Sequence, residues 1–167
     1  MLVLQHPDEA REAKNSARLL RLSLARCRVV VGDVFEPEVL LSLLDGDVSG
    51  TALLYPPDTK IEGVAPTATV RPRRLVLLDG TWRRSAQMLR ANPLLQSLPR
   101  WSVAPADAAR YAALRRARRP DQLSTLEATC AALARIEGTT TRYAPLLDAF
   151  DRFVADRAAR ASGAAPP

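Results

Sequence analysis

The sequence predicts an α/β protein whose mainly parallel β-sheet is flanked by helices. Short apolar runs alternate with amphipathic stretches along the 167 residues, which is the pattern of strands and helices in alternation. The runs are apolar throughout, as expected for parallel strands covered on both faces. Two of them, LLYP (53–56) and LLDGTW (77–82), end abruptly. Ligands of such sheets bind beyond the carboxyl ends of the strands, so we expect the functional site there.

The first third of the chain predicts two helices and two strands. Apolar residues recur at helical spacing over 8–25, which predicts a helix. CRVVVG (27–32) is apolar, β-branched and closed by glycine, which indicates a buried strand. A helix is expected over 36–44, because Pro37 suits a first turn and Asp-Gly-Asp follows Leu44. TALLYPP (51–57) is a second strand, ended by two prolines.

The rest of the chain predicts two further strands and three helices. A Thr- and Pro-rich loop comes first and a frayed tail comes last. The expected segments are a loop at 58–72, a strand RLVLLDG (74–80), a helix from Thr81 to Asn92 that stops before Pro93, a short strand RWSVAP (100–105), an aperiodic stretch at 105–122, a helix at 125–137 with Gly138 at C′, a helix at about 143–160, and the tail 161–167. Residues 1–160 are expected to form one domain.

Positive charge is concentrated in the middle of the chain. Residues 71–119 hold twelve arginines and two acids, whereas the remainder holds 12 basic and 16 acidic residues. A general preference for arginine over lysine does not explain why acids are missing from this region. A segregated basic region is typical of proteins that bind a polyphosphate, and it predicts a nucleic-acid partner.

Other composition features exclude several classes of protein. No apolar run approaches the roughly 20 residues of a membrane span, and the first residues lack the features of a signal peptide, so a cytoplasmic location is expected. Cys27 and Cys130 lack metal-ligand neighbours and are expected to be small buried thiols, so no metal is expected. The glycine motifs of Rossmann and P-loop sites are absent, and a single histidine argues against a Ser-His-Asp triad.

Asp79 and Trp82, in RRLVLLDGTWRRS (73–85), are the first candidate site residues. Asp79 has two interpretations, as the N-cap of the helix that follows and as a general base at a strand end next to a permissive glycine. Trp82 is either a core aromatic residue or a stacking platform for a base or for adenine.

Two further segments also have a structural and a functional interpretation. Ser124 and Glu127 have the spacing of a capping box, and the same helix N-terminus offers free N–H groups to a ligand. RRARR (115–119) is either a solvated loop or a surface that contacts phosphates and so positions RNA.

Four blocks of the sequence, in this order, are similar to those of the DTW-domain family, whose signature is Asp-x-Thr-Trp. They are LQHPDEAREAKNSARLL (4–20), LLYP (53–56), DGTWRRSAQMLRANPLLQSLPR (79–100) and LSTLEATCAAL (123–133). Many members also carry a cysteine-rich, zinc-binding segment before the first block. This sequence shows none, so either the branch lacks it or the gene start is misplaced.

The resemblance implies a tRNA-uridine aminocarboxypropyltransferase related to the SPOUT methyltransferases, with a C-terminal trefoil knot. Such an enzyme transfers the 3-amino-3-carboxypropyl group of S-adenosyl-L-methionine to N3 of a uridine, here expected at variable-loop position 47 of tRNA. The by-product is 5′-methylthioadenosine, and no obligate protein partner is implied. The alternatives are a SPOUT-type RNA methyltransferase and a non-catalytic RNA-binding protein.

The site residues follow from the resemblance and from the basic region. Asp79 is expected either to take the N3 proton, with its arginine neighbours keeping it ionised, or to orient the uracil. The resemblance implies that the donor contacts Tyr55, Pro56, Leu78, Gly80, Thr81, Trp82, Leu98, Leu114, Arg115, Ser124, Thr125 and Glu127. The expected RNA contacts are Arg71, Arg73, Arg74, Arg83, Arg84, Arg116, Arg118 and Arg119.

Overall fold

A computed structural model of the chain describes residues 1–12, 15–56, 71–103, 123–139 and 141–161. Within these residues five strands form a parallel sheet in the order β2-β1-β4-β3-β5. The strands are β1 (Leu2–Gln5), β2 (Arg28–Val31), β3 (Thr51–Leu54), β4 (Arg74–Asp79) and β5 (Arg100–Trp101). The predicted α/β fold with a parallel sheet is therefore confirmed.

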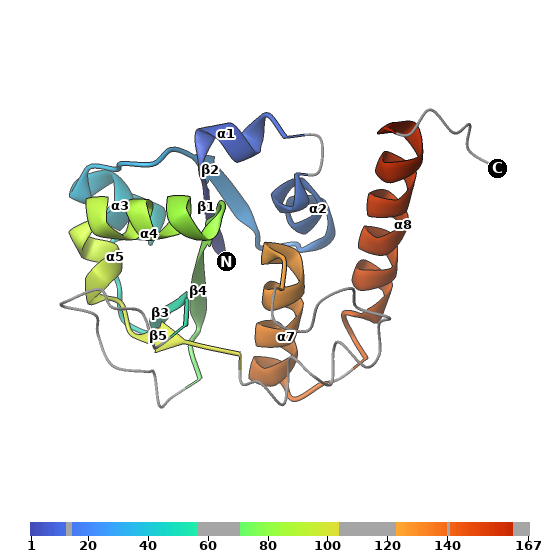
Figure 1. Cartoon of the computed structure of the whole chain (residues 1–167). Coiled ribbons are helices and arrows are strands. Elements are labelled where there is room, and N and C mark those ends of the chain that lie inside the picture. Colours follow the sequence, from blue (N-terminus) through green and yellow to red (C-terminus); the bar gives the residue numbers. More distant parts are fainter. Residues whose placement is uncertain (13–14, 57–70, 104–122, 140, 162–167) are drawn as a thin grey trace.

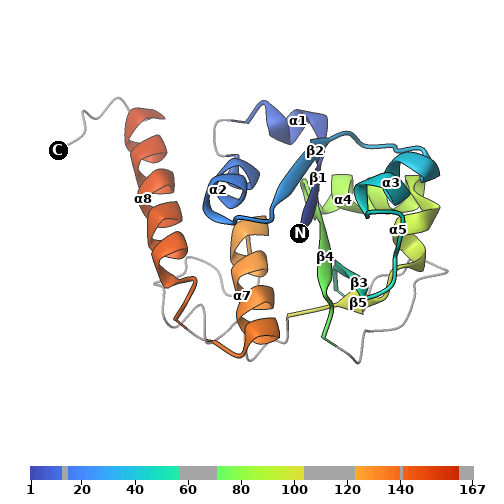
Figure 2. The same cartoon turned by 180° about the vertical axis from the view of Figure 1, so that it is seen from behind.

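Helices cover both faces of the sheet (Figures 1 and 2). One face carries α2 (Ser16–Ser23) and α7 (Thr125–Glu137), with α8 (Ala144–Ala161) packed outside them. The other face carries α3 (Pro37–Leu43), α4 (Trp82–Ala91) and α5 (Pro93–Ser97), and the short α1 (Pro7–Ala10) follows β1. No helix in the described part of the chain has the length and apolar character of a membrane span.

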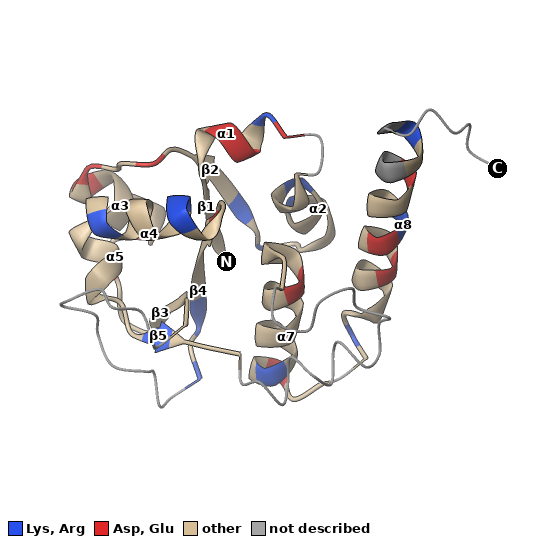
Figure 3. Cartoon of the chain, viewed as in Figure 1, with Lys and Arg blue, Asp and Glu red and all other residues tan. Residues whose placement is uncertain are grey.

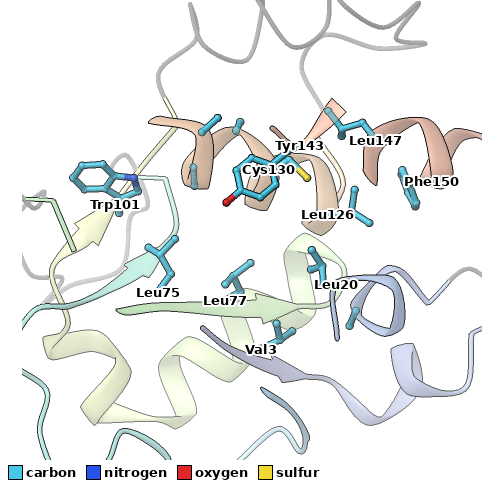
Figure 4. Close-up of a cluster of buried hydrophobic side chains, with 14 of the residues drawn as sticks. Val3, Leu20, Leu75, Leu77, Trp101, Leu126, Cys130, Tyr143, Leu147 and Phe150 are labelled. Carbon is cyan, nitrogen blue, oxygen red and sulfur yellow. The ribbon is translucent and has the colours of Figure 1, made fainter. Parts of the chain in front are cut away.

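Side chains of β4 alternate between two cores. Leu75 and Leu77 belong to the core beneath α7, which also contains Val3 of β1 and Leu126 of α7 itself (Figure 4). Val76 and Leu78 belong to the second core, under α3, α4 and α5. By the same alternation, Asp79 projects to the α7 face of the sheet.

The N-terminal part of the chain differs from the prediction in three ways. Residues 2–5 were not predicted as a strand, yet β1 is fully buried between β2 and β4. The strand at 27–32 was predicted to be buried, but β2 lies at the edge of the sheet with partly exposed side chains. The single helix expected over 8–25 is instead two helices, α1 and α2, because Asn15 caps a new helix by accepting a hydrogen bond from the Arg18 N–H.

The other predicted elements agree with the structure to within a few residues. β3, β4, α3, α7 and α8 lie where they were expected, β5 is confirmed as a two-residue strand, and Gly138 ends α7 with a φ of 68°. The helix that starts after Thr81 ends before Pro93 as predicted, but Pro93 then opens a further helix, α5. Most of the predicted loop at 58–72, and all of 105–122 with its RRARR run, lie outside the described residues.

Asn92 joins the segment after β2 to the end of α4. Its buried side chain accepts from the Phe35 N–H at 2.9 Å and donates to the carbonyls of Asp33 at 2.8 Å and Met88 at 2.6 Å. Replacing Asn92 with Ala leaves these backbone groups without a partner, and should lower the unfolding free energy by about 2–4 kcal/mol in urea denaturation. Ser97→Ala, which removes one hydrogen bond at the surface, is the control and should cost less than about 0.5 kcal/mol. Equal effects would contradict the role assigned to Asn92.

Candidate functional site

The candidate site lies at the carboxyl ends of β1 and β4. Gln5 ends β1 and Asp79 ends β4, and the two residues are neighbours in the parallel register. The His6 N–H continues this pairing by donating to the Asp79 carbonyl at 2.9 Å. Both side chains project to the α7 face. The site predicted at the end of β4 therefore has a second polar side chain beside it, at the end of β1.

The carboxyl group of Asp79 is buried and hydrogen-bonded on both sides. Its side chain is 6% exposed. The Gln5 amide donates to Oδ2 at 2.7 Å, and the hydroxyl of Thr125, the first residue of α7, forms a second side-chain hydrogen bond. Burial raises the pKa of Asp79, the bonds from Thr125 and Gln5 offset part of that rise, and the nearby Glu9 carboxylate raises it further. Asp79 therefore accepts a proton more readily than an exposed aspartate.

Thr81 rather than Asp79 caps the following helix. The Thr81 hydroxyl accepts from the Arg84 N–H at 3.4 Å, at the start of α4. The interpretation of Asp79 as an N-cap is therefore wrong. Gly80 stands between the two residues, and a Cβ there would lie 3.3 Å from the Cβ of Arg84, closer than side chains normally allow.

Gln5 and Asn15 belong to the site, although neither was predicted as a site residue. The Gln5 amide also donates to the Asn15 Oδ1 at 2.9 Å, and that oxygen caps α2. The network thus connects Asp79 with the ends of β1, α2 and α7. Their signal in the sequence was the family block at 4–20, which contains both residues, but nothing in that block indicated a contact with Asp79.

The capping box predicted at the start of α7 is confirmed. The Ser124 hydroxyl accepts from the Glu127 N–H at 3.3 Å, and the Glu127 carboxylate accepts from the Ser124 N–H at 2.8 Å. This cap holds Thr125 against Asp79, so the helix N-terminus takes part in the site.

Trp82 and Tyr55 form an aromatic pair at the same edge of the sheet. Trp82 is 58% exposed, so its interpretation as a core residue is wrong. Its ring meets the buried Tyr55 ring edge to face, with centroids 6.1 Å apart. Burial raises the pKa of Tyr55, and the guanidinium of Arg100, 5.4 Å from the ring centroid, opposes this rise.

The remaining residues predicted to contact S-adenosyl-L-methionine lie at the carboxyl edge of the sheet, in the hydrophobic core or outside the described residues. Pro56 is half-buried and directly follows Tyr55, whereas Leu78 and Leu98 are buried in the core under α3, α4 and α5. Leu114 and Arg115 lie outside the described residues, as do Arg116, Arg118 and Arg119.

The arginines that flank Asp79 in the sequence do not surround its carboxylate. Arg74 begins β4, about 17 Å from the end of the strand, and there donates to Asp45 at 2.8 Å and to the Asp47 carbonyl at 2.7 Å. Arg73 lies at that same end and donates to Ser49. The expectation that the flanking arginines keep Asp79 ionised is wrong, since burial is the largest influence on its pKa.

The other predicted RNA contacts in the described part differ in how available they are. Arg84 pairs with Asp8 at 2.7 Å and with Glu9 at 3.0 Å, which joins α4 to the acidic α1 (Figure 3). Arg71 and Arg83 are exposed.

Among the described residues no group of three or more His, Cys, Asp or Glu could hold a metal ion. Cys130 is buried and Cys27 is half-buried.

Fold and site together define an α/β protein with a buried, hydrogen-bonded carboxyl group at the carboxyl edge of a parallel sheet. Residues 1–158 match the family described as the DTW domain, and the chain belongs to that family. The resemblance inferred from the four sequence blocks is therefore confirmed, and Asp79, Gly80, Thr81 and Trp82 occupy its signature.

Two curated relatives carry the same name. The chain is 31% identical over 143 residues to tRNA-uridine aminocarboxypropyltransferase 2 of Mus musculus, covering 82% of this chain and 47% of the relative. It is 29% identical over 143 residues to tRNA-uridine aminocarboxypropyltransferase 2 of Drosophila melanogaster, covering 82% and 56%. The chain thus spans about half the length of these relatives. No solved structure is significantly similar to it.

Proposed function

We propose that this protein is a tRNA-uridine aminocarboxypropyltransferase. It transfers the 3-amino-3-carboxypropyl group of S-adenosyl-L-methionine to N3 of a uridine in the tRNA variable loop, and 5′-methylthioadenosine leaves. The observation that carries the proposal is the buried Asp79 carboxyl group with its raised pKa, at the strand end that bears the family signature. The names of the two relatives support the same class of reaction.

Asp79 acts as the general base in this reaction. Uridine N3 carries a proton at neutral pH and becomes a competent nucleophile when that proton passes to the carboxylate. The N3–carbon bond then forms as the carbon–sulfur bond of the sulfonium breaks, and the electron pair of that bond leaves with methylthioadenosine. Gln5 and Thr125 hold the carboxylate in one orientation, which favours a productive approach of the uracil.

The residues around Asp79 suit a sulfonium nucleoside. S-adenosyl-L-methionine supplies an electrophilic carbon next to a good leaving group. Trp82 offers an exposed aromatic face to an adenine, and Tyr55 with Pro56 forms a wall beside it. Backbone groups at 78–82 and the N-terminus of α7 provide polar contacts, so no glycine-rich motif is required.

The basic region 71–119 is the proposed RNA surface, in which Arg71 and Arg83 are exposed and to which the RRARR run is proposed to contribute. Replacing Arg115, Arg116, Arg118 and Arg119 together should weaken tRNA binding and reduce the slope of log K against log salt by about 3 to 4. The measurement is a filter-binding series at several salt concentrations. Arg26→Ala and Arg28→Ala, two exposed arginines outside the region, serve as the control. An unchanged slope would remove RRARR from the surface.

The proposed function is tested by the product and the modified nucleoside. Purified protein is incubated with S-adenosyl-L-methionine and, separately, tRNA and ribosomal RNA. We expect methylthioadenosine and an aminocarboxypropyl-uridine from tRNA by mass spectrometry. S-adenosylhomocysteine would instead identify a SPOUT-type methyltransferase, and no donor binding would favour a non-catalytic RNA-binding protein. Modification of ribosomal RNA alone would keep the chemistry and change the substrate.

The resemblance extends the proposal to the whole chain. It supports a single domain over 1–160, a SPOUT-like C-terminal knot and a cytoplasmic location close to the tRNA substrate.

A further inference from the structure

Arg100 carries a charge that the described residues do not balance. Its side chain has 0% exposure, and none of its three guanidinium nitrogens has a hydrogen-bond partner within the described part of the chain. Arginine remains protonated even though burial lowers the pKa of Arg100. A buried, unpaired charge is strongly unfavourable, so a guanidinium without a hydrogen-bond partner calls for a partner from outside the described residues.

Among the described residues, Arg100 also contacts the ring of Tyr55, which offers its N–H groups no hydrogen-bond acceptor. Its guanidinium carbon lies 5.4 Å from the ring centroid. Arg135, by contrast, has both solvent and a hydrogen-bond acceptor for its guanidinium. It lies 4.7 Å from the Trp101 ring centroid, but it is exposed and also donates to the Ser102 carbonyl at 2.8 Å.

Arg100 is level with Val76 in the register of the sheet, three residues before Asp79, and β3 lies between its strand and β4. Trp101 packs under α7, so Arg100 projects to the opposite face, toward Tyr55. Tyr55 directly follows the pair Leu54 and Leu77, and thus stands opposite the residue before Asp79. The guanidinium therefore lies against Tyr55 of the aromatic pair, on the face of the sheet opposite to the Asp79 side chain, and a ligand must pass over the carboxyl edge to reach it.

We propose that the Arg100 guanidinium binds the carboxylate of the donor's methionine end. This inference rests on the proposed function, which supplies a donor with one free carboxylate. A carboxylate matches a guanidinium with two parallel hydrogen bonds. It also sits at the end of a slender chain and can reach a group with no exposed surface, whereas a backbone phosphate flanked by two sugars cannot. Because Arg100 is covered, Tyr55 or a neighbouring side chain moves as the donor enters.

The test compares two ligands on Arg100→Met, which keeps the length of the side chain and removes its charge. S-adenosyl-L-methionine and its decarboxylated analogue are titrated by calorimetry. Wild-type protein should prefer the carboxylated ligand by at least about tenfold, and the variant should lose that preference. The Tm of the ligand-free variant should rise by several degrees, because an unpaired buried charge is gone. A merely structural arginine would instead lower the Tm when removed.

Arg135→Met is the matched control, and should keep the wild-type preference between the two ligands. An Arg100→Met protein that keeps the preference overturns the inference, and so does one that is unfolded or less stable without ligand, since Arg100 would then be satisfied within the protein. Wild-type protein that binds neither ligand contradicts the proposed function itself, so the two failures are distinguishable.

Discussion

Asp79→Asn is expected to fold and to bind S-adenosyl-L-methionine, but to modify tRNA on the order of 10²- to 10⁴-fold more slowly. The amide can accept from Gln5 and donate to the Thr125 hydroxyl, so the buried hydrogen bonds survive. It cannot take the N3 proton. The measurement is single-turnover formation of methylthioadenosine, with donor affinity determined separately by calorimetry.

The matched control for this variant is Asp33→Asn. Asp33 is an exposed carboxylate just beyond the end of β2, which β1 separates from β4, and it should be replaceable without loss of rate. If Asp79→Asn turned over at a near-normal rate, Asp79 would be a structural residue and the base would have to be sought elsewhere.

The unfolding free energy of Asp79→Asn, compared with that of wild type, is a second measurement, and the direction of its change can be predicted. The folded-state pKa of Asp79 is raised above its ordinary value of 3.8, so folding favours the protonated carboxyl. The stability that this group contributes is present at low pH and is lost as pH rises through the folded pKa. Above that pKa the ionised, buried group lowers the stability of the fold. The Asn variant should therefore be at least as stable as wild type at pH 7, while being far less active.

Gln5→Met should move the acid limb of the rate profile to higher pH. On the proposed mechanism, activity requires ionised Asp79 and falls as pH drops through the pKa of that group. The Gln5 hydrogen bond favours the ionised form and so lowers the pKa, against the larger effect of burial. Without this bond the pKa rises further, and the loss of rate is greater at low pH than at high pH. The measurement is kcat/KM between pH 5 and 9.

Gln96→Met is the control for the loss of a glutamine amide. Its amide donates to the Arg90 carbonyl at 3.1 Å, remote from Asp79, and its removal should leave the pH profile unchanged. A Gln5→Met protein with a uniformly lower rate and an unshifted profile would show that Gln5 supports the fold without acting on Asp79.

The sequence correctly predicted those helices and strands whose pattern depends only on neighbouring residues. The apolar run of β4, the periodicity of α7, its capping box and its terminal Gly138 were all readable from adjacent residues, because hydrophobic period and caps depend on neighbours three or four positions apart. The ordered family blocks placed Asp79 at the strand end. β1 was not predicted as a strand, and its place in the sheet depends on pairing with β2 and β4, which lie far along the chain.

The sequence by itself determined the class of fold, the family and the identity of the central carboxylate. Only the tertiary structure decided which groups surround that carboxylate. Arg74 is close to Asp79 in sequence, yet an extended strand carries the two to opposite edges of the sheet. Gln5 is 74 residues away and donates to it. In the sequence Arg100 is one of the twelve arginines of the basic region, and only the structure shows that its guanidinium is buried without a hydrogen-bond partner among the described residues. Burial and pairing depend on residues that are distant in the chain, so no local pattern encodes them.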